Sequence, residues 1–238
     1  MFSATATRPP EPGTAAVDLF WLPLGAGGWF VRRNGRAYEA LMARIEHRPR
    51  FDLYHSALEV RVDGERFVIE MTPVRDDGGD GHVRRGGAGD DARRGAVGGD
   101  HVDGARRRGA VAGGAVGSRW AGRLRIFRYE VRRWRDGLIP DVGEAVDSPR
   151  RLSADPVVAR RVLELVLQVP TPVWGRDELR AGDMWNSNSL IAWLIECSGL
   201  DAASIEPPVG GRAPGWDAGV VVAGRSRAAA RVPPPDQP

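Results

Sequence analysis

The chain has 238 residues and a formal net charge of +3, and all 34 of its basic residues are arginine. The single cysteine, Cys197, excludes an internal disulfide framework and a cysteine-only zinc site, and the four histidines argue against a multi-histidine metal site. The sequence pI of about 9.7 suggests nucleic-acid binding, but that function requires the positive charge to gather on one surface.

The excess positive charge lies outside the segments that are able to form a core. Residues 1–74 hold nine arginines and nine acidic residues, and residues 119–224 hold 14 of each. The net charge comes from residues 75–118, which contribute +1, and from residues 225–238, which contribute +2. We therefore expect no nucleic-acid partner. The all-arginine usage is typical of a GC-rich bacterial genome.

The first block begins with an apolar run and an amphipathic segment. Residues 17–24 predict a buried strand that leads into the glycine-rich loop 25–28. Asp18, Pro23 and the glycines interrupt the longer apolar run 15–31, which therefore does not predict a membrane span. Apolar side chains at i, i+3, i+4 and i+7 predict a helix over 33–47.

Asp63-Gly64 is the strongest short-range signal of a two-residue β-hairpin, here joining strands 53–62 and 65–72. This turn fixes the pairs of one apolar face: Val62–Glu65, Val60–Phe67, Leu58–Ile69 and Ser56–Met71. His55 and Glu70 become diagonal neighbours on the other, more polar face, with Cα atoms about 7–8 Å apart. The carboxylate could orient the imidazole as in a catalytic triad. Alternatively, His55 is a strand histidine with an ordinary hydrogen bond.

Residues 75–118 differ from everything around them, with 14 glycines, eight arginines, seven aspartates and no aromatic residue, leucine or isoleucine. Such a segment buries too little apolar surface to offset the entropy of ordering it, so we predict a disordered insert. A local frameshift in a GC-rich gene would give the same composition. We also expect flexible tails at 1–14 and 225–238, which leaves 15–74 and 119–224 as a single domain.

The second block combines a strand with two helices. An alternating segment predicts a strand over 123–134, and Asp155-Pro156 is a favourable start for a helix over 155–168. An apolar stripe predicts a last helix over 187–198 that ends at Gly199. A glycine- and proline-rich loop over 207–216 and a short strand over 220–222 complete the prediction.

The last helix opens with Asn186-Ser187-Asn188-Ser189, and Ser187 lies on the same stripe as its buried leucines and isoleucines. A serine at a helix N-terminus benefits from the positive end of the helix dipole and from free N–H groups that can hold an oxyanion. Asparagine and serine are also the preferred N-cap residues, so capping is the alternative interpretation.

The early strand Tyr54–Val60, with its histidine, and the late Asn186-Ser187-Asn188 stretch together resemble the circularly permuted papain-fold proteins, which include permuted NlpC/P60-like and PPPDE-like hydrolases. The resemblance covers residues 53–71 and 185–197. It implies an α+β fold in which an antiparallel sheet packs against helices. It also implies a hydrolase or acyltransferase that acts on an amide, ester or thioester.

By this resemblance Ser187 stands where the family has its nucleophilic cysteine, His55 is the general base and Glu70 the orienting acid. Asn186 would help to hold the oxyanion, and further residues would line the pocket, namely Asn188, Trp185 and Thr72. A serine hydroxyl is far less acidic than a thiol and needs a true general base. The cysteine-to-serine change therefore also fits a catalytically inactive module that binds a small ligand or peptide in the same cleft.

Two other groups of residues have possible binding roles. Arg212 and Trp216, in the glycine- and proline-rich loop, are candidate anchors for an anionic or apolar ligand. The arginines and aromatic residues of 123–135 match a nucleic-acid pattern, but an exposed strand face explains them equally in a neutral core. We expect no cofactor, no metal and no stable membrane insertion, a cytoplasmic location, and a small-molecule or peptide substrate. The oligomeric state stays open.

Overall fold

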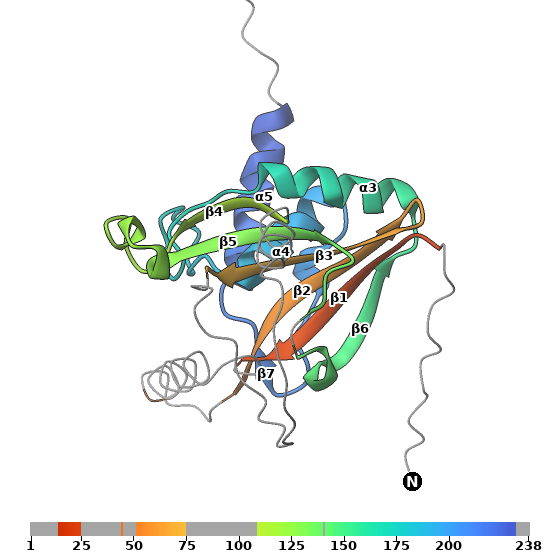
Figure 1. The fold of residues 1–238 in the computed structure, drawn as a ribbon, viewed down its shortest axis with the longest axis horizontal. Coiled ribbons are helices and arrows are strands. Elements are labelled where there is room, and N and C mark those ends of the chain that lie inside the picture. The colour runs from red at the N-terminus through yellow and green to blue at the C-terminus, as the bar shows by residue number, and fades with distance from the viewer. Residues whose placement is uncertain (1–13, 25–43, 45–50, 75–108, 140, 232–238) are drawn as a thin grey trace, which may run out of the picture.

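The computed structural model describes residues 14–24, 44, 51–74, 109–139 and 141–231, and Figure 1 shows a curved sheet with helices on one side. The strands lie in the order β4-β5-β3-β2-β1-β6, with antiparallel neighbours throughout. They are β1 (Ala16–Pro23), β2 (Asp52–Val62), β3 (Glu65–Pro73), β4 (Ala110–Ala115), β5 (Arg128–Arg135) and β6 (Val146–Ser153). The two-residue β7 (Gly211–Arg212) adds a parallel pairing to the start of β2. The predicted α+β class with an antiparallel sheet is confirmed.

The β2–β3 hairpin has the register that the sequence predicts. Val62 pairs with Glu65, Val60 with Phe67 and Leu58 with Ile69. Asp63 and Gly64 both have positive φ angles, 55° and 76°, as a two-residue turn of the type that matches strand twist requires.

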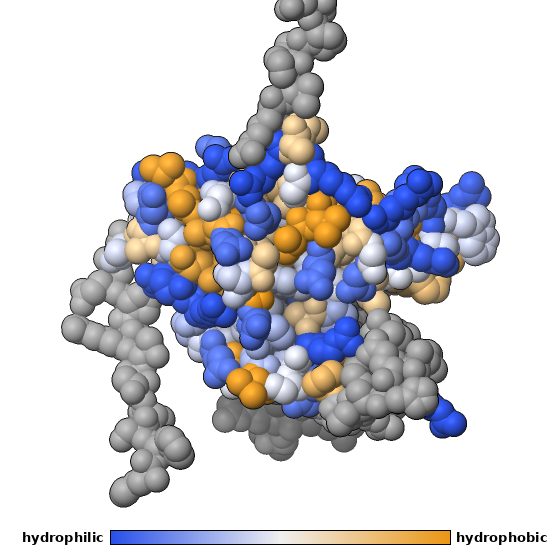
Figure 2. Space-filling model, turned by 180° about the vertical axis from the view of Figure 1, so that it is seen from behind, coloured by the Kyte–Doolittle hydropathy of each residue, from blue (hydrophilic) through white to orange (hydrophobic). Residues whose placement is uncertain are grey.

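Three helices of the described chain cover one face of the sheet: α3 (Pro156–Leu165), α4 (Ser187–Ser198) and α5 (Trp216–Arg231). Asp155 caps α3 by accepting a 2.7 Å hydrogen bond from the Val157 N–H, and α4 ends at Gly199 with a φ of 97°, both as predicted. Almost every residue of α4 is buried, since α4 lies between the sheet and α5. We call this side of the sheet the helix face. Figure 2, drawn from behind, shows the mixed hydrophilic and hydrophobic exterior of the helix layer.

The main core lies between the helix face and the helices. It joins alternate residues of β1 and β2 to the buried stripe of α4, and its largest members include Trp21, Leu58, Ile69, Leu190, Ile191 and Leu194. A second, smaller apolar cluster on the opposite face, which we call the outer face, contains Phe20, Leu22, Ala57, Val68 and Ile139. Successive residues of a strand point to opposite faces, so the two clusters divide each strand between them.

The structure corrects three predicted segments. Within the expected disordered insert, residues 109–118 are described and contain β4, whereas 75–108 lie outside the described residues. Gly113 and Gly114 are required there, because a Cβ would lie 2.5 Å from the Tyr129 carbonyl oxygen or 2.8 Å from its ring. The glycine content that suggested disorder thus permits close packing of β4 on β5.

The other two corrections concern helical segments. The strand predicted over 123–134 begins only at Arg128, and two 3₁₀ turns, Ala121–Arg123 and Arg125–Phe127, precede it. The strand predicted over 220–222 and the tail predicted from 225 belong instead to α5, which packs against α4. Of the helix predicted over 33–47, only Arg44 is described, and the 25–28 loop lies outside the described residues.

Candidate functional site

The first turn of α4 is closed by a reciprocal capping box. Asn186 Oδ1 accepts hydrogen bonds from the N–H groups of Asn188 and Ser189, at 2.8 and 3.3 Å. Ser189 Oγ accepts a 3.1 Å bond from the Asn186 N–H and donates a 2.7 Å bond to the Gly215 carbonyl. These bonds satisfy the backbone N–H groups of Asn186, Asn188 and Ser189, so none of these three groups is free to hold an oxyanion.

Asn188 ties the start of α4 to the sheet. Its Oδ1 accepts a 2.9 Å hydrogen bond from Ser56 Oγ on β2. Its Nδ2 donates to the carbonyl oxygens of Tyr54, at 3.0 Å, and of Pro214, at 2.9 Å. Ser56 and Asn188 are 1% and 2% exposed, so these bonds form away from solvent. We refer to Ser56, Asn188 and the Tyr54 carbonyl as the Ser56–Asn188 clamp.

Ser187, the predicted nucleophile, occupies the first position of α4 and is 6% exposed. Unlike the side chains of Asn186, Asn188 and Ser189, its hydroxyl makes no hydrogen bond with another residue in the described part of the chain. The structure therefore distinguishes Ser187 from its three capping neighbours.

His55, the predicted general base, lies on the outer face of the sheet. In the β1–β2 register Leu22 pairs with His55 and Trp21 pairs with Ser56. Leu22 belongs to the outer-face cluster and Trp21 to the core under the helices. Paired residues share a face, so the residue of β2 that meets the start of α4 is Ser56, one position beyond His55.

The surroundings of His55 favour the neutral imidazole. Burial lowers its pKa to about 4, and the negative charge of Asp141 opposes that shift only in part. Glu70 lies on the same outer face, since it is two residues along β3 from Val68 of the outer-face cluster. Its cross-strand partner is Arg132 of β5. Thr72, further along β3, donates a long 3.4 Å hydrogen bond to the carbonyl of its neighbour Pro73.

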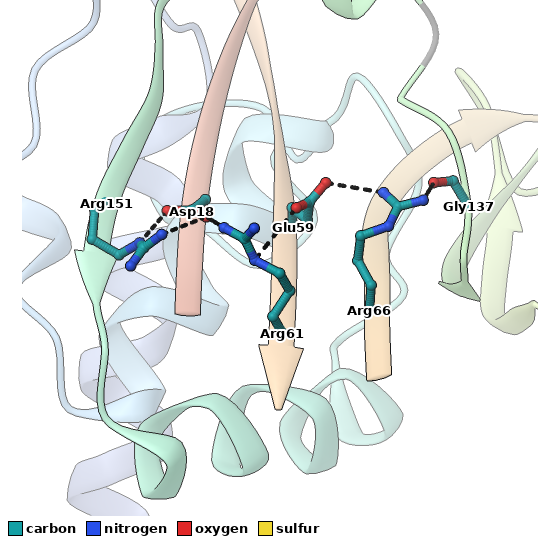
Figure 3. A network of polar contacts seen from close by, with 6 residues as sticks. All are labelled: Asp18, Glu59, Arg61, Arg66, Gly137 and Arg151. Carbon is teal, nitrogen blue, oxygen red and sulfur yellow. Dashed lines mark hydrogen bonds and ion pairs between the residues drawn. The ribbon is translucent and has the colours of Figure 1, made fainter. Parts of the chain in front are cut away.

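A chain of ion pairs crosses the outer face beside this region (Figure 3). The buried carboxylate of Asp18 accepts 2.5 Å bonds from Arg151 of β6 and Arg61 of β2. Glu59 lies between Arg61 and Arg66, with its Oε2 3.0 Å from Arg66, and Arg66 also donates to the Gly137 carbonyl at 2.7 Å. The network joins four strands, and each charged residue in it forms an ion pair with another member.

Of the other predicted binding residues, Trp216 and Trp185 are buried in the fold, and Arg212 lies in a short strand. Trp216 packs in the core, with its ring centroid 5.0 Å from that of Trp21, and its Nε1 donates a 3.0 Å bond to the Ala202 carbonyl. Trp185 is 2% exposed, and its indole N–H has no hydrogen-bond partner in the described part of the chain. Arg212 lies in β7, paired with Leu53 at the start of β2.

An open cavity of 660 Å³ lies at the β4 edge of the sheet, which sequence reasoning missed. Its apolar wall includes Val74 and Val173, and its charged groups are Arg119, Arg123, Arg128, Glu130 and Glu178. Arg119 forms a two-pronged pair with Glu178, at 2.7 and 3.2 Å, which holds the pKa of the Glu178 carboxyl below its usual value. Tyr129 at its floor donates to the Pro172 carbonyl at 2.7 Å, and burial raises its pKa. The segment looked like disordered filler, so no sequence signal pointed to this cavity.

The described residues contain no group of three or more His, Cys, Asp or Glu side chains placed to hold a metal ion. None of the described helices is both long and apolar enough to cross a membrane. Comparisons with protein-family models, with curated proteins and with solved structures find no match for this chain.

Proposed function

We propose that this chain is a non-catalytic module of the permuted papain-like type that binds a small ligand or peptide. The observation that carries the proposal is the Ser56–Asn188 clamp. A hydrolase needs a base next to its nucleophile. Here β2 instead presents the Ser56 hydroxyl to α4, where it donates a hydrogen bond to the side-chain amide oxygen of Asn188. Neither group takes up a proton near neutral pH, so the pair stabilises the fold without offering general-base catalysis.

The position of His55 supports the same proposal. A general base must come within hydrogen-bond distance of the proton that it removes. His55 projects from the outer face, while Ser187 belongs to a helix on the other side of the sheet.

The cavity at the β4 edge is our proposed ligand site. Arg119 is neutralised by Glu178, and Glu130 pairs with Arg132, so Arg123 and Arg128 dominate the charge near the cavity. Together with the apolar wall formed by Val74 and Val173, this arrangement suits a ligand that carries a carboxylate next to a short apolar group. β4 is the terminal strand of the sheet, and the part of its edge before Ala115, whose carbonyl accepts a hydrogen bond from the Trp174 N–H, also suits an extended peptide.

Active-site labelling tests the absence of catalysis. We expect a fluorophosphonate probe to leave the wild type unlabelled, and Ser187→Cys to be as inert to iodoacetamide at neutral pH as an ordinary buried thiol. Adding Ser56→His to Ser187→Cys should raise thiol reactivity, because the imidazole then projects toward α4 and can stabilise the thiolate. The matched control is Ser187→Cys alone, in which His55 is still present. Labelling of the wild type that Ser187→Ala abolishes would overturn the proposal.

Selection from a displayed peptide library tests the ligand site. Peptides enriched on the full chain should be rich in acidic residues and should bind Arg123→Glu at least tenfold more weakly. The control is Arg150→Glu, an exposed arginine on β6 at the opposite edge of the sheet. Equal binding by both variants would place the ligand elsewhere.

The second candidate is the serine hydrolase, which one observation favours. Within the part of the chain that the structure describes, the hydroxyl of Ser187 makes no hydrogen bond at the first position of a twelve-residue helix, although the side chains of Asn186, Asn188 and Ser189 are all bonded. That is where a nucleophile benefits from the helix dipole. The fluorophosphonate experiment separates the two candidates.

A further inference from the structure

The loop between β4 and β5 concentrates the exposed large hydrophobic side chains of the molecule. Ten such side chains are exposed among the described residues, and four of them lie within 120–127: Trp120, Leu124, Ile126 and Phe127. Trp120 is 73% exposed and Ile126 58%. Scattered single apolar residues are ordinary on a surface, but a group of them on one loop marks an interaction site.

The structure holds this loop in place, so the exposure is built into the fold. The Leu124 N–H donates to the Ala121 carbonyl at 2.9 Å and the Phe127 N–H to the Leu124 carbonyl at 3.0 Å, which forms the two 3₁₀ turns. Arg128 Nε donates to the Gly122 carbonyl at 2.6 Å, and Arg119 is anchored on Glu178. A rearrangement of the loop backbone that buried these side chains would therefore have to break these bonds.

The same loop is strongly basic. Residues 119–128 contain four arginines, at 119, 123, 125 and 128, and no acidic residue. Each arginine is exposed. The loop therefore alternates apolar and cationic side chains over one short stretch, although the rest of the domain is close to neutral.

The shape of the loop indicates what kind of partner it fits. In Figure 1 it projects beyond the ends of β4 and β5, at the left edge of the view, as a convex tip. Leu124 and Ile126 are aliphatic and cannot stack on bases, which argues against a nucleic acid as the partner. Tryptophan, aliphatic side chains and arginine on one protruding element are the combination that binds the interface of an anionic lipid bilayer.

We propose that loop 119–128 docks the protein reversibly on an anionic membrane surface. Trp120, Leu124 and Ile126 enter the headgroup region, where the amphipathic indole is favoured. Arg123 and Arg128 lie against the lipid phosphates, where each adds about fivefold to the affinity at low salt, whereas Arg119 is paired with Glu178. The cavity at the β4 edge, which lies next to the loop, would then face the membrane region, but the proposal does not depend on its ligand.

Flotation of the full chain with lipid vesicles tests this proposal. We expect the protein to float with vesicles that contain phosphatidylglycerol, to remain behind with pure phosphatidylcholine, and to bind more weakly as salt rises. The double variant Trp120→Ala/Ile126→Ala should lose binding at least tenfold. Leu138→Ala, a matched control that is 75% exposed outside the loop, should bind like the wild type. Thermal unfolding monitored by circular dichroism would confirm that each variant folds.

Three outcomes would overturn the proposal. The first is no flotation with anionic vesicles. The second is flotation that the Trp120→Ala/Ile126→Ala variant retains, since the arginine-containing C-terminal segment would then be responsible. The third is that the protein does not bind vesicles but associates, through this loop, with single-stranded RNA or with a second copy of the chain. None of these results bears on the fluorophosphonate experiment, so the two proposals fail separately.

Discussion

The two faces of the sheet handle polar groups in different ways. On the helix face β2 presents the buried hydroxyl of Ser56, and Asn188 satisfies it directly under α4. On the outer face Asp18, Glu59, Arg61 and Arg66 form a continuous network around a small apolar cluster, with the arginines partly open to water. A polar group buried under the helices needs a hydrogen-bond partner within the protein. On the outer face, the guanidinium groups of the arginines can also be hydrated by solvent.

This difference explains why neighbouring residues of one strand have unrelated roles. His55 and Ser56 are adjacent in sequence, but strand alternation assigns one to each face. The family resemblance predicted that His55 faces the start of α4, whereas in the structure the residue of β2 that contacts α4 is Ser56. Four changes test the contrast between the faces.

The largest effect is expected for Asn188→Ala, on the helix face. The change removes three hydrogen bonds, two of them buried, and leaves the Ser56 hydroxyl and the Tyr54 and Pro214 carbonyls without this partner. We expect the free energy of unfolding to fall by about 4 kcal/mol, measured by urea denaturation. The control Ser56→Ala removes only one of the bonds and should cost about 1–2 kcal/mol. A loss below about 1 kcal/mol for Asn188→Ala would show that the clamp is not a stabilising element.

Asp18→Asn tests the outer face. The carboxylate is 2% exposed and neutralises Arg61 and Arg151, whose side chains are 20% and 38% exposed. Removing its charge leaves two arginines side by side, but they can hydrate in part. We therefore expect a smaller loss, about 2–3 kcal/mol, in the same denaturation experiment. A loss as large as that of Asn188→Ala would mean that the outer face is as dry as the helix face.

His55 provides a pH-dependent test of the outer face. Its pKa of about 4 in the fold lies below the ordinary value of 6.5. The unfolded chain therefore binds a proton between these values before the folded chain does, and stability falls as pH decreases through that range. At about pH 5 the contribution amounts to about 2 kcal/mol relative to neutral pH.

The measurement for His55 is the difference in unfolding free energy between the wild type and His55→Gln as a function of pH. We expect the two curves to run parallel above about pH 7 and the wild type alone to lose stability between about pH 6.5 and 5, before most carboxyl groups titrate. Parallel curves throughout would show that the imidazole is hydrated in the folded chain.

The smallest effect is expected for Glu65→Gln at the hairpin. Its pair with Arg135 is well exposed, with side chains 37% and 64% accessible and an N–O distance of 2.9 Å. Exposed ion pairs contribute little, so the loss should be within about 0.5 kcal/mol and should vanish at high salt. A larger loss would mean that water does not reach this pair in the folded chain.

The elements that the sequence predicted best are those governed by local chemistry. Asp63-Gly64 determined a hairpin register that the structure reproduces in the pairs Val62–Glu65, Val60–Phe67 and Leu58–Ile69, because the turn itself requires positive φ angles. Asp155-Pro156 and Gly199 marked the ends of helices for equally local reasons. β4 was missed because the glycines that look disordered in isolation are those that let a strand approach Tyr129 closely.

The candidate site required information that no local pattern contains. The sequence showed that Ser56 belongs to the apolar face and that α4 carries an apolar stripe, which together could have identified Ser56 as the residue facing the helix. The Asn-Ser-Asn-Ser capping potential was also evident. Two features of the site depend on contacts between residues far apart in the chain. Asn188 bonds to Ser56 of β2, and Trp216 packs against Trp21 in the core.

By itself, the sequence determined the α+β class, the neutral charge of the folding blocks, the hairpin register, the start of α3 and both ends of α4. The register and the helix ends follow from turn geometry, capping or periodicity within a few residues, and the charge follows from the composition of the two blocks. Only the tertiary structure decided which face of the sheet α4 covers, and with it which of His55 and Ser56 meets the helix. It also decided that residues 110–115 of the glycine-rich segment form a strand, which leads into an apolar, arginine-rich loop. The physical reason is that burial is a property of packed elements, and a strand offers both of its faces until another element covers one.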